Sequence, residues 1–400
     1  MPNTFPQELI DVVVDELHAD MASLAACALS FRSMVASAQM HLFYKVTLAP
    51  PPAASKGGLK KASQCQRLAK ILSSSPHLIP LIKDLRIIDD DPNSESWMVN
   101  SARSLSTILP LLTLKRISIR CALGSVDWDH MPRALKAPLQ NIFKSPGLQS
   151  IQLHGIFLTG PRSSPLYLIF GDASDLRELS FSYEIRKRVN PNVGPSHWQP
   201  KLTSLAITSN DTEDLILTLL NPTIYFSCLR TLCLASLLDP EINQLLTAIQ
   251  DRSAIESLTI FYSHDWVFTS GLSALRSMKS LRSLRICTNT IRDGMVAVIR
   301  DDCAPNVSLE HITIEMCVFT AARHSVTEWT ELTTALVDSG KTADVLFHRM
   351  GLRGRRQWTY KRCLEACLLN AVQGLPADVW RSLTVKESEY VSMEEVYASW

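Results

Sequence analysis

The segments Leu229-Arg-Thr-Leu232-Cys-Leu234, Ile255-Glu-Ser-Leu258-Thr-Ile260 and Leu281-Arg-Ser-Leu284-Arg-Ile286 follow one another along the chain and share one pattern, apolar-x-x-apolar-x-apolar. The last two apolar residues of each segment are two positions apart, so both side chains point to the same side of a short β-strand. The pattern occurs nine times in all, which predicts a stack of similar units. The other six copies begin at Ile82, Leu114, Leu148, Leu176, Leu202 and Leu309.

The segments between the copies contain apolar residues at the spacing of an α-helix. Ile242, Leu245, Leu246 and Ile249 form one such stripe, and from Leu148 onward the copies start 26–28 residues apart. This interval holds one strand, one helix and two turns. A single coil of this kind cannot bury its apolar edge alone, so neighbouring coils must stack around a shared core. The pattern therefore predicts an α/β fold over residues 78–348: a right-handed solenoid with parallel strands inside and helices outside. Unrelated strand–helix units in an ordinary α/β domain are the alternative.

The first 48 residues do not follow the repeat. Asp20 is expected to cap a second helix, and a strand-like segment at 44–48 ends the module. About 40 residues in short helices make too small a core to be comfortably stable alone, so we expect an apolar face to remain for a partner. The two predicted apolar stripes are Leu9, Ile10, Val13, Val14 and Leu17, and then Leu24, Cys27, Ala28 and Phe31.

Composition excludes several classes of protein. The 400 residues are 46% hydrophobic and carry 40 Lys and Arg against 39 Asp and Glu, which argues against a disordered chain. A net charge of +1 is too small to attract nucleic acid or an anionic membrane by itself. Ten scattered cysteines, without a signal peptide or a membrane-spanning segment, predict reduced thiols in the cytoplasm or the nucleus or both.

Motifs that would carry chemistry are missing from the sequence. It contains no Gly-rich phosphate loop, metalloprotease His pair, nucleophile elbow or dinucleotide fingerprint. Cys363 and Cys367 lie one helical turn apart, but no further ligand falls at the spacing of a metal site. We therefore expect no catalytic residues, no metal, no cofactor and no enzymatic activity.

The repeated pattern resembles the leucine-rich repeat, in particular the longer variety with a full helix in every coil. The resemblance covers residues 78–348. It departs from the family because the Asn or Cys that usually follows the strand is not consistently present. In such arrays the residues between the apolar strand positions form an inner surface. There we expect a target-binding patch of Phe261, Trp266 and Arg285, since aromatic and arginine side chains are the usual anchors of interfaces.

The N-terminal module contains two motifs, Phe5-Pro6-Gln7-Glu8-Leu9-Ile10 and Leu24-Ala-Ala-Cys27-Ala-Leu29-Ser-Phe31. These motifs resemble the F-box of large families of fungal proteins. Phe5, Ser30, Phe31 and Met34 depart from the residues usual at their positions. The resemblance implies that this module binds a Skp-type adaptor and, through it, a cullin ligase. The residues it assigns to adaptor binding are Phe5, Pro6, Leu9, Ile10, Leu24, Cys27 and Phe31.

The sequence thus divides into four segments: an F-box module (1–48), a linker and first helix (49–77), the solenoid (78–348), and a C-terminal cap and tail (349–400). We expect the substrate-receptor subunit of an SCF-type ubiquitin ligase, which holds an unidentified protein target. The alternative is a repeat-protein scaffold unconnected to ubiquitin ligation, in which the N-terminal helices only cover the first coil.

Overall fold

The computed structural model of the 400-residue chain forms two compact units. The first contains residues Met1–Thr159 and Leu168–Leu176, and the second contains Gly160–Tyr167 and Arg177–Trp400. The structure describes residues 6–50, 63–89, 96–121, 126–128, 130–157, 174–183, 201–209, 226–235, 239–251, 253–262, 271–288, 291, 293–317, 325–348 and 383–388.

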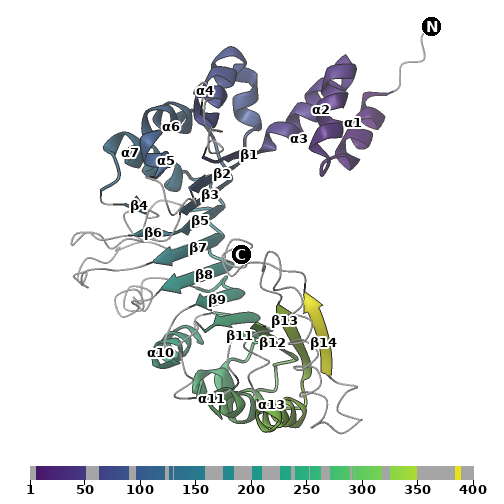
Figure 1. The fold of residues 1–400 in the computed structure, drawn as a ribbon, viewed down its shortest axis with the longest axis vertical. Coiled ribbons are helices and arrows are strands. Elements are labelled where there is room, and N and C mark those ends of the chain that lie inside the picture. Colours follow the sequence, from purple (N-terminus) through teal and green to yellow (C-terminus); the bar gives the residue numbers. More distant parts are fainter. Residues whose placement is uncertain are drawn as a thin grey trace, which may run out of the picture. The chain divides into compact units, whose positions relative to one another are not determined.

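Parallel strands in sequence order form the inner layer of each unit (Figure 1). The first unit has the order β1-β2-β3-β5, with a separate parallel pair β4-β6, and the second runs from β7 to β14. The strands of the first unit are β1 (Lys45–Leu48), β2 (Asp84–Asp89), β3 (Arg116–Cys121), β4 (Val126–Asp127), β5 (Ser150–His154) and β6 (Ile156–Phe157). Those of the second unit are β7 (Glu178–Tyr183), β8 (Ser204–Ser209), β9 (Thr231–Ala235), β10 (Ser257–Phe261), β11 (Ser283–Thr288), β12 (His311–Cys317), β13 (Thr342–His348) and β14 (Leu383–Ser388).

The repeated apolar pattern accounts for this arrangement. All 27 apolar positions of the nine copies are buried, each at 6% exposed or less. Equivalent residues lie opposite one another in the ladder, as Leu232, Leu258 and Leu284 do on successive strands. Each buried Leu or Ile contributes roughly 1.5–3 kcal/mol relative to an exposed one. The prediction of an α/β solenoid resembling the leucine-rich repeat is confirmed.

Helices cover the side of the strands to which these apolar residues point (Figure 1). In the first unit they are α4 (Gln64–Ser74), η2 (Pro76–Leu81), α5 (Trp97–Asn100), α6 (Ala102–Ile108), η3 (Leu109–Leu111) and α7 (Arg133–Phe143). In the second they are α10 (Asp239–Ile249), η4 (Ser273–Ser277), α11 (Asp293–Ala297), the π-helical η5 (Val298–Cys303) and α13 (Val326–Asp338).

One predicted helix differs from the structure. A single helix was expected between residues 59 and 77, but α4 ends at Ser74 and the tighter η2 begins at Pro76. Proline has no amide hydrogen to continue an α-helix, so the chain changes its helical type there. Leu68 and Leu72 face the core, whereas Ile71 is exposed.

The N-terminal module consists of α1 (Gln7–Glu16), α2 (Met21–Ser30), η1 (Arg32–Met34) and α3 (Val35–Tyr44). Asp20 caps α2 as predicted, because its carboxylate accepts hydrogen bonds from the amides of Ala22 and Ser23. The Asp15 carboxylate lies 2.7 Å from Nε2 of His41 and joins α1 to α3. The module's own core is small: Val14, Leu24 and Ala38, with a few partly buried neighbours.

The array extends beyond the nine copies at both ends. The strand expected near residues 44–48 is β1, and it pairs in parallel with β2, so the N-terminal module leads straight into the sheet. Strands β13 and β14 continue the ladder after the ninth copy, and β14 falls within the segment assigned to the cap and tail. Strand β13 lacks the full pattern, because Gly340 stands at its first apolar position. Strand β14 carries the pattern in Trp380-Arg-Ser-Leu383-Thr-Val385, which the sequence analysis overlooked.

Buried polar groups connect successive coils of the second unit. Nδ2 of Asn306 donates to the carbonyl oxygens of Leu275 (2.6 Å) and Met278 (3.1 Å) in the preceding coil. The Asp302 carboxylate accepts from the Leu272 amide at 2.7 Å and from Nε of Arg276 at 2.9 Å. Asn306 thus satisfies backbone groups between coils, although it lies ahead of the strand and not after it.

Candidate interaction surfaces

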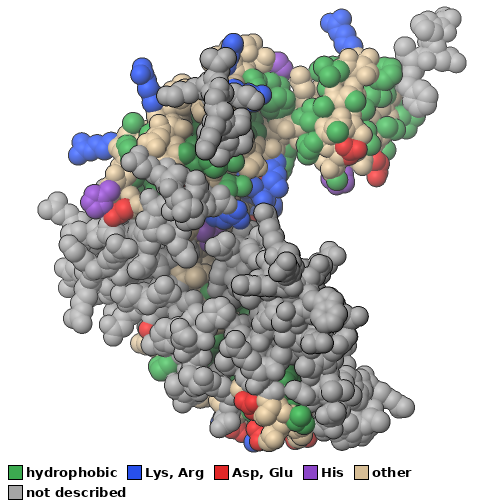
Figure 2. All heavy atoms as spheres, viewed as in Figure 1, with side chains coloured by type: hydrophobic (Ala, Val, Ile, Leu, Met, Phe, Trp, Pro, Cys, Tyr) green, Lys and Arg blue, Asp and Glu red, His purple; other side chains and the backbone are tan. Residues whose placement is uncertain are grey.

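Large exposed apolar side chains are concentrated on the N-terminal helices. Of the twelve exposed large hydrophobic residues among those described, eight belong to this module, and Figure 2 shows hydrophobic side chains across its visible face. We call this set the N-terminal apolar face. Its members are Leu9, Val12, Val13, Met21, Leu29, Phe31, Met40 and Tyr44.

The structure separates the residues that the F-box resemblance assigned to adaptor binding. Pro6, Leu9 and Phe31 are exposed, while Ile10 and Cys27 are half-buried. Leu24 is fully buried, because it packs with Val14 and Ala38 in the core of the module. The assignment of Leu24 to a contact surface is therefore wrong in this conformation. Phe5 lies outside the described residues, and the sequence analysis missed the exposed Val12, Leu29 and Met40.

A second surface is the inner side of the sheet in the first unit, made by strand residues that alternate with the buried apolar ones. We call it the first inner surface. Its residues are Lys45 and Thr47 on β1, Asp84, Arg86 and Ile88 on β2, Arg116, Ser118 and Arg120 on β3, and Ser150, Gln152 and His154 on β5. It carries four cations and one carboxylate, and it contains no Phe, Tyr or Trp.

The cations of this surface surround its carboxylate. Asp84 lies opposite Lys45 on one side and Arg116 on the other, and its Oδ1 is 3.8 Å from Nε of Arg86. Lys45, Arg86 and Arg116 are exposed, whereas Asp84 is only 6% exposed. In Figure 2, Lys and Arg side chains gather where Figure 1 draws β2 and β3.

His154 lies at the end of β5, opposite Arg120 on β3. Burial, reinforced by the charge of Arg120, lowers the pKa of this imidazole to about 4. The ring is therefore neutral at physiological pH and adds no charge to the first inner surface.

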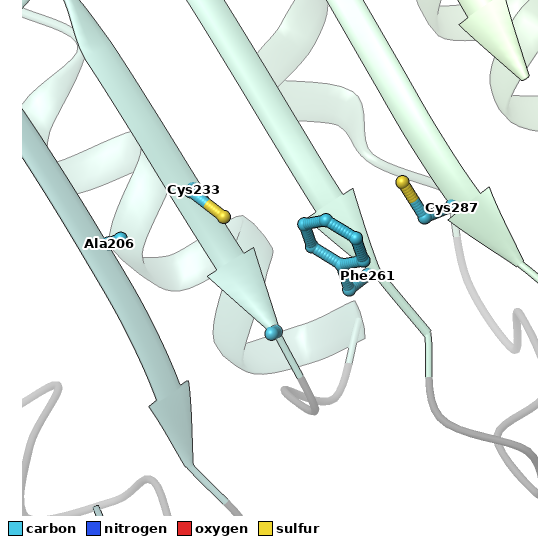
Figure 3. Close-up of a cluster of buried hydrophobic side chains, with 5 residues drawn as sticks. Ala206, Cys233, Phe261 and Cys287 are labelled. Carbon is cyan, nitrogen blue, oxygen red and sulfur yellow. The ribbon is translucent and has the colours of Figure 1, made fainter. Parts of the chain in front are cut away.

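The corresponding side of the sheet in the second unit, which we call the second inner surface, has a different character. Its residues Ala206, Cys233, Ala235, Phe261 and Cys287 form a buried apolar cluster. The ring of Phe261 lies between Cys233 and Cys287 of the neighbouring strands (Figure 3) and is 1% exposed. This cluster is separate from the core on the helix side of the strands.

A buried ion pair borders that cluster. The Arg285 guanidinium is 2.6 Å from Oε1 of Glu315, and Glu315 is itself buried. Burial raises the pKa of the Cys233 thiol to about 12, and burial together with the charge of Glu315 raises that of Cys287. Both thiols are therefore protonated and poorly reactive.

The structure corrects the expected accessibility of the target-binding patch. Phe261 was expected as an accessible anchor on an open, polar surface, but its ring is buried and packs with apolar residues of the neighbouring strands. Arg285 is partly accessible and is bound to Glu315. Trp266 lies outside the described residues. The sequence could not show this enclosure, because small and apolar residues at alternating positions read equally well as a solvated row.

Within the described ranges, no group of three or more His, Cys, Asp or Glu residues is placed to hold a metal ion. Nor does any described helix have the length and apolar character needed to cross a membrane.

Comparisons with known proteins give a likeness among solved structures and none among family models or curated proteins. No protein-family model matches the sequence, and the search of curated proteins finds no match. Among solved structures, the chain is similar to the leucine-rich-repeat-containing protein LegL7 from Legionella pneumophila, with 13% sequence identity and a TM-score of 0.37. The match covers 80% of this chain and 97% of that protein. The description of the fold above rests on strand order and register.

Proposed function

We propose that this protein is the substrate-receptor subunit of an SCF-type ubiquitin ligase. In this proposal the N-terminal apolar face binds a Skp-type adaptor, which connects the chain to a cullin, and the solenoid binds a protein target. The chain itself performs no chemistry and acts in the cytoplasm or the nucleus.

The observation that carries the proposal is the concentration of exposed apolar side chains on α1, α2 and α3. The small core of the module uses Val14, Leu24 and Ala38, so the N-terminal apolar face is not needed to hold these helices together. A concentration of exposed large apolar side chains on one module is typical of an interaction site. It fits the adaptor contact that the F-box resemblance implies.

The mechanism of such a receptor is proximity. One surface fixes the receptor to the ligase and another holds the target, so a target lysine experiences a high effective concentration of the transferring subunit. Two separate surfaces are required, and the first unit alone has two of different chemistry: one apolar and one basic.

Copurification with a recombinant Skp-type adaptor tests the proposal. We expect Leu9→Asp with Val13→Asp to reduce adaptor recovery by about tenfold or more, because the change places charges in an apolar interface. Both side chains are exposed, so the helices should stay folded. The matched control is Leu111→Asp with Val307→Asp, which adds the same charges at exposed apolar positions elsewhere and should leave recovery unchanged. Failure of the wild-type chain to bind the adaptor would refute the proposal.

A scaffold unconnected to ubiquitin ligation is the second candidate. It is favoured by the pairing of β1 with β2 and by the packing of α3 against η2, which give the N-terminal helices a structural role at the first coil. For this candidate we expect no adaptor to be recovered, and the same target to copurify with the wild type and with the Leu9→Asp, Val13→Asp variant.

A further inference from the structure

Three accessible cations meet on the first inner surface. Lys45 and Arg116 lie on the two strands that flank β2, each opposite Asp84, and Arg86 is two residues further along β2. Neighbouring strands are about 4.8 Å apart, which places the backbones of Lys45 and Arg116 about 10 Å from each other. One poorly exposed carboxylate cannot neutralise three cations, so the described residues of this surface carry a net positive charge although the whole chain carries only +1.

Two exposed arginines near the start of a strand in the second unit pair with a glutamate of the next coil. Nε of Arg230 is 3.4 Å from Oε1 of Glu256, and NH1 of Arg282 is 2.6 Å from Oε1 of Glu310. Within the described part of the chain, Lys45 and Arg116 have no ion pair of this kind. Lys45 and Arg116 therefore differ from Arg230 and Arg282, whose charges are balanced by the next coil.

We propose that the first inner surface binds an extended, Asp- and Glu-rich segment of a partner protein. An extended chain in the polyproline II conformation has three residues per turn and rises about 3.1 Å per residue, so carboxylates three positions apart lie on one side, about 9 Å from each other, and reach Lys45 and Arg116 together. The hydroxyl of Thr47 and the amide of Gln152 supply further polar contacts on the same surface. The inference rests on the proposed function only in treating this segment as the ligase target.

A protein segment fits this surface better than a nucleic acid. Proteins that bind single strands stack the bases on aromatic side chains, and the inner-facing positions of β1, β2, β3 and β5 include none. The charge is confined to a few residues in a chain of nearly zero net charge, whereas binding to a phosphate backbone requires many cations.

Fluorescence anisotropy with the full chain tests the inference. The probe is a labelled peptide of about twelve residues with Glu at every third position and Ser and Gly between, and its control has Gln in place of Glu. We expect the Glu peptide to bind and the Gln peptide not to bind. Arg86→Gln with Arg116→Gln should weaken binding about fivefold or more at low salt. The matched control, Arg103→Gln with Arg133→Gln, removes two exposed arginines from α6 and α7 of the same unit and should bind as the wild type does.

Three results would overturn the inference. Equal binding of the two peptides would exclude recognition of carboxylates, and equal weakening by both double variants would show a general charge effect. Tighter binding of an oligothymidine of the same length would assign the surface to nucleic acid. Unchanged circular dichroism and thermal unfolding of Arg86→Gln with Arg116→Gln establish that a loss of binding is not a loss of fold. Adaptor copurification is a separate measurement, so peptide binding can fail while the ligase proposal stands.

Discussion

The inner surfaces of the two units are built on the same kind of parallel strand ladder, but their residues differ in exposure and charge. In the first unit, residues such as Arg86 and Arg116 are exposed and carry positive charge. In the second unit, inner-facing positions hold Ala206, Cys233 and Phe261, which are buried together. The repeat pattern fixes only the residues that face the helices. The residues between them are free to vary, and their variation decides which part of the array presents a surface to partners.

The largest expected effect follows from the burial of Phe261. Replacing it with Ala removes a ring that is 1% exposed, and such substitutions cost about 3–5 kcal/mol of unfolding free energy. Thr47→Ala on the first inner surface should cost less than about 0.5 kcal/mol, because the side chain is exposed. Denaturant unfolding of both variants measures the difference, and equal costs would show that Phe261 is not enclosed.

Two ion pairs of equal length sharpen the comparison between buried and exposed charge. Arg285–Glu315 and Arg282–Glu310 both measure 2.6 Å, but the side chain of Glu315 is 3% exposed and that of Glu310 is 64% exposed. Glu315→Ala leaves the partly buried Arg285 without its carboxylate and should cost about 3 kcal/mol. Glu310→Ala should cost less than about 1 kcal/mol. Thermal unfolding of the two variants decides the matter, and a larger loss for Glu310→Ala would contradict this account.

A smaller effect is expected from His154. Its pKa is about 4 in the folded protein and 6.5 for an unburied imidazole, so the unfolded chain binds a proton that the folded chain does not. Stability is therefore complete above pH 6.5 and falls as the pH decreases towards 4. His154→Gln should flatten this dependence of the melting temperature, whereas His77→Gln, at an exposed position, should leave it unchanged. Identical profiles for the wild type and His154→Gln would remove His154 as the cause.

The parts of the fold that could be predicted from the sequence are those that depend only on residues nearby in the chain. The apolar positions of the strands, the stripe from Ile242 to Ile249 and the Asp20 cap follow local rules, and the structure agrees with all of them. Strand β13 was missed because Gly340 stands three residues before Ala343, where the pattern has an apolar residue, although Ala343 and Val345 are buried like their partners on β12.

The interaction surfaces were harder to predict because the exposure of a side chain depends on its packing against residues distant in the sequence. The two helical stripes identified Leu9 and Leu24 as equivalent apolar residues. In the structure Leu9 is exposed, whereas Leu24 forms part of the core of the module. Phe261 was placed on the correct face of its strand, but its burial depends on residues from neighbouring coils. The basic group of Lys45, Arg86 and Arg116 emerges only when three strands are in register, since these residues are far apart in the sequence.

Cysteine labelling tests the contrast between the two inner surfaces most directly. In Thr47→Cys protein treated with a maleimide, we expect the introduced cysteine and the exposed Cys228 to react in the native state. Cys233 and Cys287 should react only after unfolding, because both are buried in the apolar cluster. Mass spectrometry of the digested protein identifies each labelled position. Labelling of native Cys233 and Cys287 as fast as the cysteine at position 47 would show that the second inner surface is open and would contradict the account.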